Sequence, residues 1–206
     1  MLIGIDFDNT IVSYDTLFHK VASEQGAVPG TTPRNKVAVR DHLRAIGKED
    51  VWTEMQGYVY GARMEEAEAY PGVIEFFRWA RATGVPLCIV SHKTLHPFIG
   101  PKYDLHQAAR GWIETHLVDE QGALVASERV FFELTKEAKW SRIGAAGCTW
   151  FIDDLPEILL ADAFPDQVQR VLFDPENHHP DTDGLQRLGD WGGIRRHFER
   201  QCSRPN

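Results

Sequence analysis

The chain opens with Met1-Leu2-Ile3-Gly4-Ile5-Asp6-Phe7-Asp8-Asn9-Thr10. The apolar run at its start is typical of a buried strand, and it leads into a loop that carries two carboxylates and a hydroxyl. Two ionised carboxylates two residues apart repel each other unless a cation or a shared proton relieves the repulsion. Mg²⁺ fits this loop best, because it binds one or two carboxylates together with waters and phosphate oxygens. The opening stretch therefore indicates a site for phosphoryl transfer.

The composition is that of an ordinary globular chain. It has 206 residues, of which 43% are hydrophobic and 25% are charged, enough for one core domain with an insertion. The formal net charge of -8, with no dense cluster of Lys and Arg, argues against a nucleic-acid-binding surface. A small anionic substrate remains compatible with this charge, because a bound metal can supply the positive charge.

Cysteine usage and the absence of membrane signals predict the compartment. The three cysteines, Cys88, Cys148 and Cys202, form neither a CxxC pair nor an even disulfide framework, which favours a reducing compartment. The N-terminus has no basic stretch before its apolar run, and no apolar run approaches the roughly 18 residues of a membrane helix. We therefore expect a soluble cytoplasmic protein that binds neither membranes nor nucleic acid.

Apolar strand-like runs recur along the chain, with helical patterns between several of them. The runs are Leu2–Ile5, Val85–Val90, Val130–Leu134, Cys148–Ile152 and Val168–Phe173. The clearest helical pattern covers Pro71–Thr83, a second begins near Thr135, and a closing helix is expected over Trp191–Phe198. This alternation predicts an α/β fold with a doubly wound parallel sheet.

The stretch 13–70 differs from the rest, because it lacks strand-like runs. It contains three helical pieces, expected at 16–25, 33–46 and 49–64. This detour is much longer than an ordinary crossover between parallel strands. We interpret it as a small α-helical cap subdomain (13–70) inserted into a core of 1–12 and 71–206; the alternative is that these helices merely extend the core.

Reactive polar groups follow four of the five expected strands. Asp6 and Asp8 follow the first, Ser91 the second, Lys136 and Lys139 the third, and Asp153-Asp154 the fourth. Ligands of an open parallel sheet bind beyond the carboxyl ends of its strands. Acids, a hydroxyl and an amine gathered at one edge suit metal-assisted attack on a phosphate.

In this order and spacing the chain resembles the haloacid dehalogenase (HAD) superfamily. The resemblance rests on Asp6-Phe7-Asp8-Asn9-Thr10, on Ser91, on a lysine after the third strand, and on Phe151-Ile152-Asp153-Asp154. It implies a Rossmannoid core in which Asp6 attacks phosphorus to give an aspartyl-phosphate and Asp8 acts as the general acid and base. It also implies that Ser91 and a lysine bind the phosphoryl group. Mg²⁺ would be held by Asp6, the Asp8 backbone carbonyl and Asp153, with Asp154 as a further carboxylate.

The lysine of this pattern is either Lys136 or Lys139, because the Lys-Pro or Lys-Gly pair that often marks the position is missing. Thr135 is a candidate N-cap for the helix that begins here, and either side chain could reach back to the site. We favour Lys136, because Trp140 and Ile143 then fall four and seven residues later on the face that packs against the sheet.

Other residues are candidates for substrate binding, each with a structural alternative. Asn9 and Thr10 are expected to contact the substrate, or else only to form the turn. Arg63 stands near the tip of the expected cap, where it would bind a leaving group or remain solvated. His92 and Lys93 would add positive charge for a substrate that carries a second anion.

These features predict a magnesium-dependent phosphatase that acts on a small phosphorylated metabolite. A phosphatase is preferred to a dehalogenase, because displacement of a halide needs no acid or base such as Asp8. The alternatives are a phosphomutase or another phosphotransferase of the superfamily, and a non-catalytic binding or regulatory protein with this fold. The sequence specifies neither the substrate nor the oligomeric state.

Overall fold

The computed structural model describes residues 1–203, which divide into two compact units. The sheet unit comprises Met1–Ile11, Ala69–His92 and the described part of Leu117–Asn206. The helical unit comprises Val12–Glu68 and Lys93–His116. Within residues 1–203, no helix is both long enough and apolar enough to cross a membrane.

The sheet unit is built on six strands in the order β10-β9-β8-β1-β4-β7, and every neighbouring pair is parallel. Their bounds are β1 (Ile3–Ile5), β4 (Leu87–His92), β7 (Val130–Glu133), β8 (Trp150–Asp153), β9 (Gln169–Phe173) and β10 (Leu185–Leu188). This unit also contains a hairpin of β5 (Val118–Asp119) and β6 (Gly122–Ala123), followed by the short helix η2 (Ser127–Arg129). Because all six strands run the same way, their carboxyl ends share one edge.

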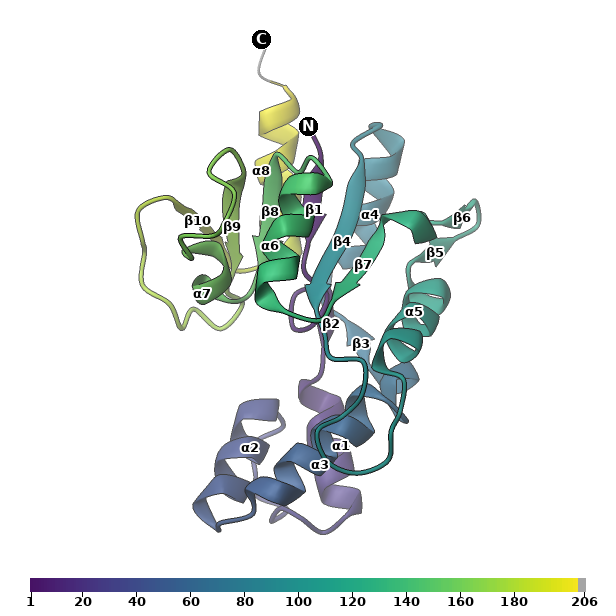
Figure 1. Ribbon diagram of the computed structural model, residues 1–206, viewed down its shortest axis with the longest axis vertical. Coiled ribbons are helices and arrows are strands. Elements are labelled where there is room, and N and C mark those ends of the chain that lie inside the picture. The colour runs from purple at the N-terminus through teal and green to yellow at the C-terminus, as the bar shows by residue number, and fades with distance from the viewer. Residues whose placement is uncertain (204–206) are drawn as a thin grey trace. The chain divides into compact units, whose positions relative to one another are not determined.

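Helices cover both faces of this sheet (Figure 1). One face carries α4 (Val73–Ala82) and α8 (Trp191–Cys202), which meet through Phe76 and Trp191, with ring centroids 5.1 Å apart. The other carries α6 (Lys136–Ala145) and α7 (Pro156–Leu159), whose apolar side chains join those of β4, β8 and β9 in a buried cluster. Burial on both faces explains why the central strands are continuous apolar runs.

Gly4 lies at the centre of the sheet, where its neighbours leave no room for a side chain. A Cβ there would lie 2.6 Å from Cδ2 of Phe151 and 2.7 Å from Sγ of Cys148, which is itself 3.5 Å from Sγ of Cys88. Gly4→Ala is therefore expected to lower the free energy of unfolding by about 1–3 kcal/mol through overpacking. Urea denaturation would measure this loss.

Gly111→Ala is the matched control for Gly4→Ala, because nothing lies within 4 Å of a Cβ built at that exposed helical position. It should stabilise the protein slightly, since alanine favours a helix over glycine by about 1 kcal/mol. Equal effects of the two variants would contradict the packing argument.

The helical unit contains α1 (Asp15–Glu24), α2 (Lys36–Ala45), α3 (Glu49–Tyr60), the short helix η1 (Met64–Glu66) and α5 (Leu105–His116). Short strands β2 (Val12–Ser13) and β3 (Glu68–Ala69) pair with each other where the chain enters this unit and leaves it. Asn35 caps α2, because its side chain accepts from the Ala38 backbone amide at 2.6 Å. The core of this unit is aromatic, with Phe18 packed against Trp52 and Tyr60.

The structure confirms all five predicted strands and the doubly wound parallel sheet, and it adds β10 and α5, which the apolar pattern did not reveal. It also extends the predicted insertion. Lys93–His116 cluster with Val12–Glu68 and not with the core to which the sequence assigned them. The reason is packing: Trp112 of α5 is buried, and its Nε1 donates to the Ala67 carbonyl oxygen at 2.8 Å.

Candidate active site

The predicted site residues of the sheet unit meet at the carboxyl edge of its central strands. Asp6 directly follows β1, Ser91 is the second-last residue of β4, and Asp153 is the final residue of β8. Parallel pairing of β1 with both β4 and β8 places these three strand ends side by side. Residues far apart in the sequence are thereby brought together by the topology alone.

The loop after β1 is held by backbone hydrogen bonds, one to β8 and one within the turn itself. The Asp6 amide donates to the Ile152 carbonyl oxygen at 2.8 Å, and the Ile11 amide donates to the Phe7 carbonyl oxygen at 3.1 Å. Asn9 adopts φ of 58°, a left-handed conformation that asparagine tolerates better than most residues. The structure thus gives Asn9 a conformational role, while substrate binding by Asn9 stays a prediction.

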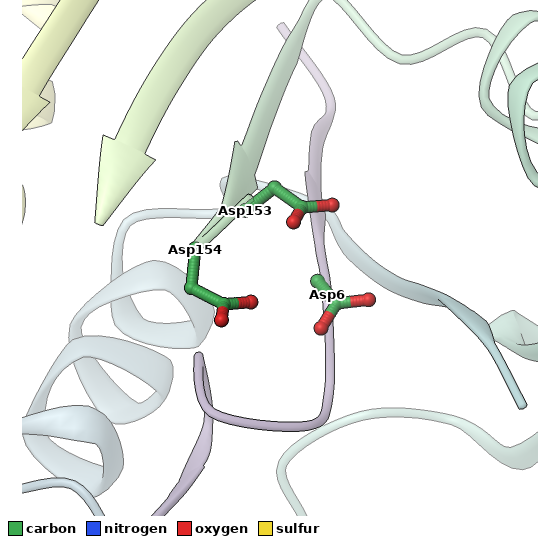
Figure 2. A group of neighbouring side chains, drawn as sticks. All are labelled: Asp6, Asp153 and Asp154. Atoms are coloured by element: carbon green, nitrogen blue, oxygen red, sulfur yellow. The ribbon is translucent and has the colours of Figure 1, made fainter. Parts of the chain in front are cut away.

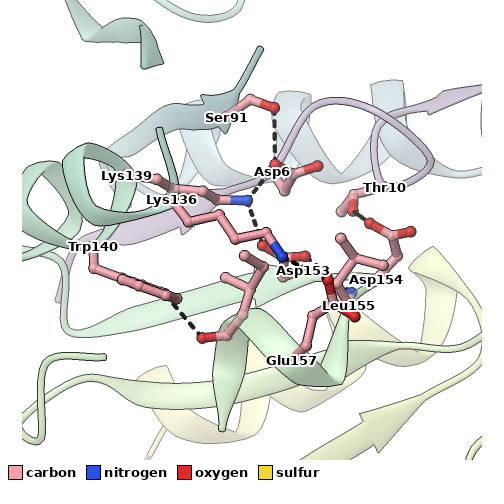
Figure 3. Close-up of polar contacts among 11 residues, drawn as sticks. Asp6, Thr10, Ser91, Lys136, Lys139, Trp140, Asp153, Asp154, Leu155 and Glu157 are labelled. Atoms are coloured by element: carbon pink, nitrogen blue, oxygen red, sulfur yellow. Dashed lines mark hydrogen bonds and ion pairs between the residues drawn. The ribbon is translucent and has the colours of Figure 1, made fainter. Parts of the chain in front are cut away.

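A buried lysine joins two carboxylates at the centre of the site (Figure 3). Lys139 Nζ lies 2.6 Å from Asp6 Oδ1 and 2.6 Å from Asp153 Oδ2, and all three residues are at most 5% exposed. Ser91 Oγ donates to Asp6 Oδ1 at 2.9 Å. Charged groups this deeply buried are costly unless they are paired, so the three ions depend on one another.

The site carries more negative than positive charge, and this shifts the pKa values of its members. Burial, with the neighbouring charges of Asp153 and Asp8, raises the pKa of Asp6 to about 7, although Lys139 opposes the shift. Burial alone would lower the pKa of Lys139, but the charges of Asp153 and Asp6 outweigh it and raise that pKa. Both groups hold their protons tightly because one ammonium faces several carboxylates. Such an excess of carboxylate also favours a bound cation.

Three carboxyl groups are close enough to share a metal ion (Figure 2). Oxygen atoms of Asp6, Asp153 and Asp154 all lie within 4.8 Å of one another. A set of carboxylate oxygens suits a hard cation such as Mg²⁺. Asp154 is held in place by Thr10, whose Oγ1 donates to Asp154 Oδ1 at 3.3 Å. The backbone carbonyl of Asp8, which the sequence resemblance implies as a further ligand, stays a prediction, and the carboxylate of Asp8 is not part of this group among residues 1–203.

The preference for Lys136 as the site lysine is wrong. Lys136 is half-exposed, and its Nζ pairs with the exposed Glu157 at 2.7 Å, whereas Lys139 pairs with Asp6 and Asp153 (Figure 3). Thr135 caps α6 as predicted, accepting from the Ala138 amide at 3.1 Å. Side chains in a helix slant toward its N-terminus, so the residue one turn inside, Lys139, covers the end that faces the strand edge.

The remaining predicted residues fall into two groups. His92 ends β4, its Nε2 lies 3.2 Å from the Leu134 carbonyl oxygen, and burial lowers its pKa, so it is not a cation at neutral pH. Lys93 and Arg63 belong to the helical unit. There Lys93 Nζ lies 4.9 Å from the Tyr60 ring centroid, and Arg63 forms ion pairs with Glu24 and Glu66. Arg63 is thus ion-paired within its own unit and not simply solvated, and its binding of a leaving group stays a prediction.

Trp191 is a supporting residue that sequence reasoning missed. Its indole Nε1 donates to the Thr10 carbonyl oxygen at 3.1 Å, so the first residue of α8 anchors the loop that follows β1. No local signal could have revealed this bond, because the two residues lie 181 positions apart.

Comparison with known proteins finds similarity in structure only: no family model and no curated protein matches the chain in sequence. A HAD-superfamily hydrolase from Ehrlichia chaffeensis superposes with a TM-score of 0.51 at 15% identity, covering 98% of this chain and 97% of that one. The L-2-haloacid dehalogenase RSc1362 gives 0.59 at 11% identity, with 96% and 98% covered.

A HAD family hydrolase from Deinococcus radiodurans, solved with bound phosphate and sodium, gives a TM-score of 0.53 at 19% identity. Here 97% of this chain and 95% of that one are covered. The similar structures thus include one described as a dehalogenase and others described only as hydrolases of the HAD superfamily. Together they show that the chain has the fold of the haloacid dehalogenase-like hydrolases.

Proposed function

We propose that the protein is a magnesium-dependent phosphatase that hydrolyses a small phosphomonoester. The observation that carries this proposal is the buried arrangement of Asp6, Lys139 and Asp153, in which one ammonium group bridges two carboxylates. Asp154 adds a third carboxylate at metal-ligand distance. The arrangement suits attack on a dianionic phosphate, which requires positive charge near the nucleophile.

In this proposal Asp6 is the nucleophile, and its carboxylate displaces the alcohol from phosphorus to form an aspartyl-phosphate. Lys139 and the Ser91 hydroxyl, which already contact Asp6, would donate hydrogen bonds to the phosphoryl oxygens. Asp6, Asp153 and Asp154 would hold Mg²⁺, with the Asp8 backbone carbonyl as a further ligand. Bound Mg²⁺ would reduce the repulsion between the phosphate and the carboxylates.

Asp8 would serve as the general acid and then the general base. It lies two residues from Asp6 in the same turn, so it can protonate the departing alcohol oxygen and afterwards accept a proton from the attacking water. A halide leaves without a proton, so the dehalogenase reaction does not need Asp8 as a general acid. Asp8 and the carboxylate group thus favour phosphate as the substrate over an alkyl halide.

The helical unit is proposed to select the leaving group. Lys93 follows Ser91 by two residues, and because His92 is neutral, Lys93 supplies the positive charge of this segment. Lys93→Ala should raise KM for phosphomonoesters that carry a carboxylate more than for those without one, whereas His92→Ala should not. Initial rates on paired substrates would measure this, and parallel KM changes for both substrate types would count against the assignment.

The test of the reaction class is product release from two panels of compounds. Small phosphomonoesters and 2-haloacids would be incubated with the wild-type protein, with Mg²⁺ or with EDTA, and free phosphate and halide measured. Phosphate release that requires Mg²⁺ would support the proposal. Halide release would identify a dehalogenase. If neither product forms with folded protein, the mutase or the binding-protein alternative gains support and phosphate transfer between sugar or alcohol positions should be assayed.

Addition of Mg²⁺ is expected to raise the melting temperature of the protein, since a ligand that binds only the native state stabilises it. The rise should be larger at pH 8 than at pH 6. Asp6, with a pKa of about 7, carries a proton at the lower pH, and this proton competes with the metal. A thermal-shift titration at both pH values measures the effect.

Asp154→Asn provides the control for the metal titration, because Asp154 is half-buried and an asparagine side-chain oxygen can still accept from the Thr10 hydroxyl. The variant should remain folded and show a smaller Mg²⁺ shift. If the rise in melting temperature caused by Mg²⁺ were the same in Asp154→Asn as in the wild type, and the same at pH 6 as at pH 8, the metal would bind elsewhere.

A further inference from the structure

The helical unit contains a pocket of its own, with a volume of about 300 Å³. This volume is at the lower end of the range for sites that hold small molecules. The pocket is lined by residues of α3, of the end of α1 and of the segment 93–104 that precedes α5: Gln25, Val51, Glu54, Met55, Tyr58, Pro101 and Tyr103. All of them belong to the helical unit, and no step of the proposed reaction uses them.

One face of α3 forms the inner wall of this pocket. The four lining residues of α3 are Val51, Glu54, Met55 and Tyr58, and their spacing of three or four residues from turn to turn places them on the same side of the helix. Met55 is buried and gives the pocket an apolar floor. Tyr58 is half-buried and lies one turn further along α3. A single ligand can therefore contact the side chains of this face together.

The segment 93–104 runs alongside α3 and forms the outer wall (Figure 1). The two approach closely because glycine stands where they touch: a Cβ at Gly57 would collide with Pro97, and a Cβ at Gly61 would collide with the Tyr103 ring. His96 Nδ1 lies 3.0 Å from the Tyr103 carbonyl oxygen, which holds the segment in place. The Tyr103 ring thus lies against the end of α3, and the outer wall is formed before any ligand binds.

Glu54 carries the one charge among the described residues that line the pocket. Its Oε1 lies 3.6 Å from the position of a Cβ at Gly100, so the carboxylate reaches across to the segment 93–104. Glu54 is exposed, and within residues 1–203 it forms no ion pair. Arg63, whose guanidinium lies 5.8 Å from the centroid of a tyrosine ring of this pocket, is already paired with Glu24 and Glu66. The pocket therefore offers a negative charge that lacks a cation.

We propose that this pocket binds a small organic ammonium ion, with its charged nitrogen on Glu54 and its apolar body against Met55 and the two tyrosine rings. An ammonium group donates charge-assisted hydrogen bonds to a carboxylate, and aromatic rings attract cations as well as apolar groups. The side-chain amide of Gln25 adds a further acceptor. Anions are disfavoured, because the Glu54 carboxylate repels them.

The experiment titrates the full-length protein, labelled with [methyl-¹³C]methionine, with phenethylamine, which is protonated at pH 7. The chain has three methionines, so loss of a signal in Met55→Leu assigns Met55, and Met64, also buried, serves as the internal control. 2-Phenylethanol and 3-phenylpropanoate keep the ring and replace the ammonium group with a hydroxyl or a carboxylate. Butylamine keeps the ammonium group and lacks the ring. We expect the Met55 signal to shift with phenethylamine at concentrations at least about tenfold lower than with the other three.

Glu54→Gln should weaken binding of phenethylamine by at least about tenfold and leave binding of 2-phenylethanol unchanged, because only the charge-assisted bond is lost. The exposed position of Glu54 means that the variant should fold. Glu65→Gln is the matched control. It removes an exposed carboxylate of the same unit that does not line the pocket, so binding should be unchanged.

Three results would overturn the proposal: no shift of the Met55 signal with phenethylamine, binding of 2-phenylethanol as tight as that of phenethylamine, or equal effects of Glu54→Gln and Glu65→Gln. Because the probes carry no phosphate and the readout is at Met55, these results leave the proposed phosphatase activity unaffected. Conversely, a protein without phosphatase activity could still show the expected binding.

Discussion

Replacing Lys139 with methionine is expected to abolish phosphate release and to lower the free energy of unfolding by about 3–5 kcal/mol. The side chain is 2% exposed and bridges Asp6 and Asp153, each at 2.6 Å. Without it, the buried carboxylates face one another with no cation between them. Urea denaturation and a phosphate-release assay, both with and without Mg²⁺, would measure the two losses.

Lys136→Met is the matched control for Lys139→Met, because the two lysines lie one turn apart on α6. The pair of Lys136 with Glu157 is exposed on both sides, so its loss should cost at most about 1 kcal/mol and leave activity intact. If Lys136→Met proved the more damaging variant, Lys139 would be a structural residue and the proposed site would need a different cation.

Asp6→Asn is expected to lower phosphate release by at least about 10³-fold while the protein stays folded. The amide has nearly the same shape as the carboxylate but is not a nucleophile. Burial raises the pKa of Asp6 to about 7, so the neutral form is already accessible at neutral pH and removal of the charge costs little stability. The variant therefore separates chemistry from folding, which Lys139→Met does not.

The two measurements for Asp6→Asn are kcat with the best substrate of the panel and the urea midpoint. If the Asp6→Asn variant retained near-wild-type turnover, Asp6 could not be the nucleophile. A large loss of stability would show instead that Asp6 is ionised and needed in the native fold without metal. Ser91→Ala removes one hydrogen-bond donor to Asp6, and it should lower the rate of phosphate release by about 10²-fold, less than Asp6→Asn does.

The sheet was predictable because its signals are local. Strands buried on both faces are apolar runs, as in Ile3–Ile5 and in the last three residues of β9, Val171, Leu172 and Phe173, all of which are buried. β10 was not predictable in the same way, because Leu185–Leu188 carries two polar residues in four and lies at the edge of the sheet. An edge strand pairs on one side only and needs no apolar run.

The site was predictable as a set of strand ends, but not in its choice of lysine. Asp6, Ser91 and Asp153 lie where the parallel strands end, so topology alone determines their neighbourhood. Lys136 and Lys139 belong to one helical turn, and only the slant of the side chains decides between them. The argument from Trp140 and Ile143 identified the correct buried face of α6 but assigned the wrong lysine to the site.

The extent of the helical unit was hidden for another reason. Lys93–His116 are separated from Val12–Glu68 by a strand and a helix of the sheet unit, so no sequence pattern links the two pieces. What unites them is tertiary contact, such as the bond from Trp112 to Ala67. Gly57 of α3 and Gly61, which caps the end of α3, mark the same packing, because a Cβ at either position would meet Pro97 or Tyr103 at under 3 Å.

The division of the chain into these two units sets an order for folding during synthesis. Every residue of the helical unit has been made once the ribosome passes His116. The central strand β1 must wait longer, because it pairs on one side with β8, where Ile3 is opposite Trp150. At about 5–20 residues per second, one edge of β1 stays open for seconds. During that interval the nascent chain presents an unpaired, wholly apolar strand edge, the kind of surface that chaperones shield from aggregation.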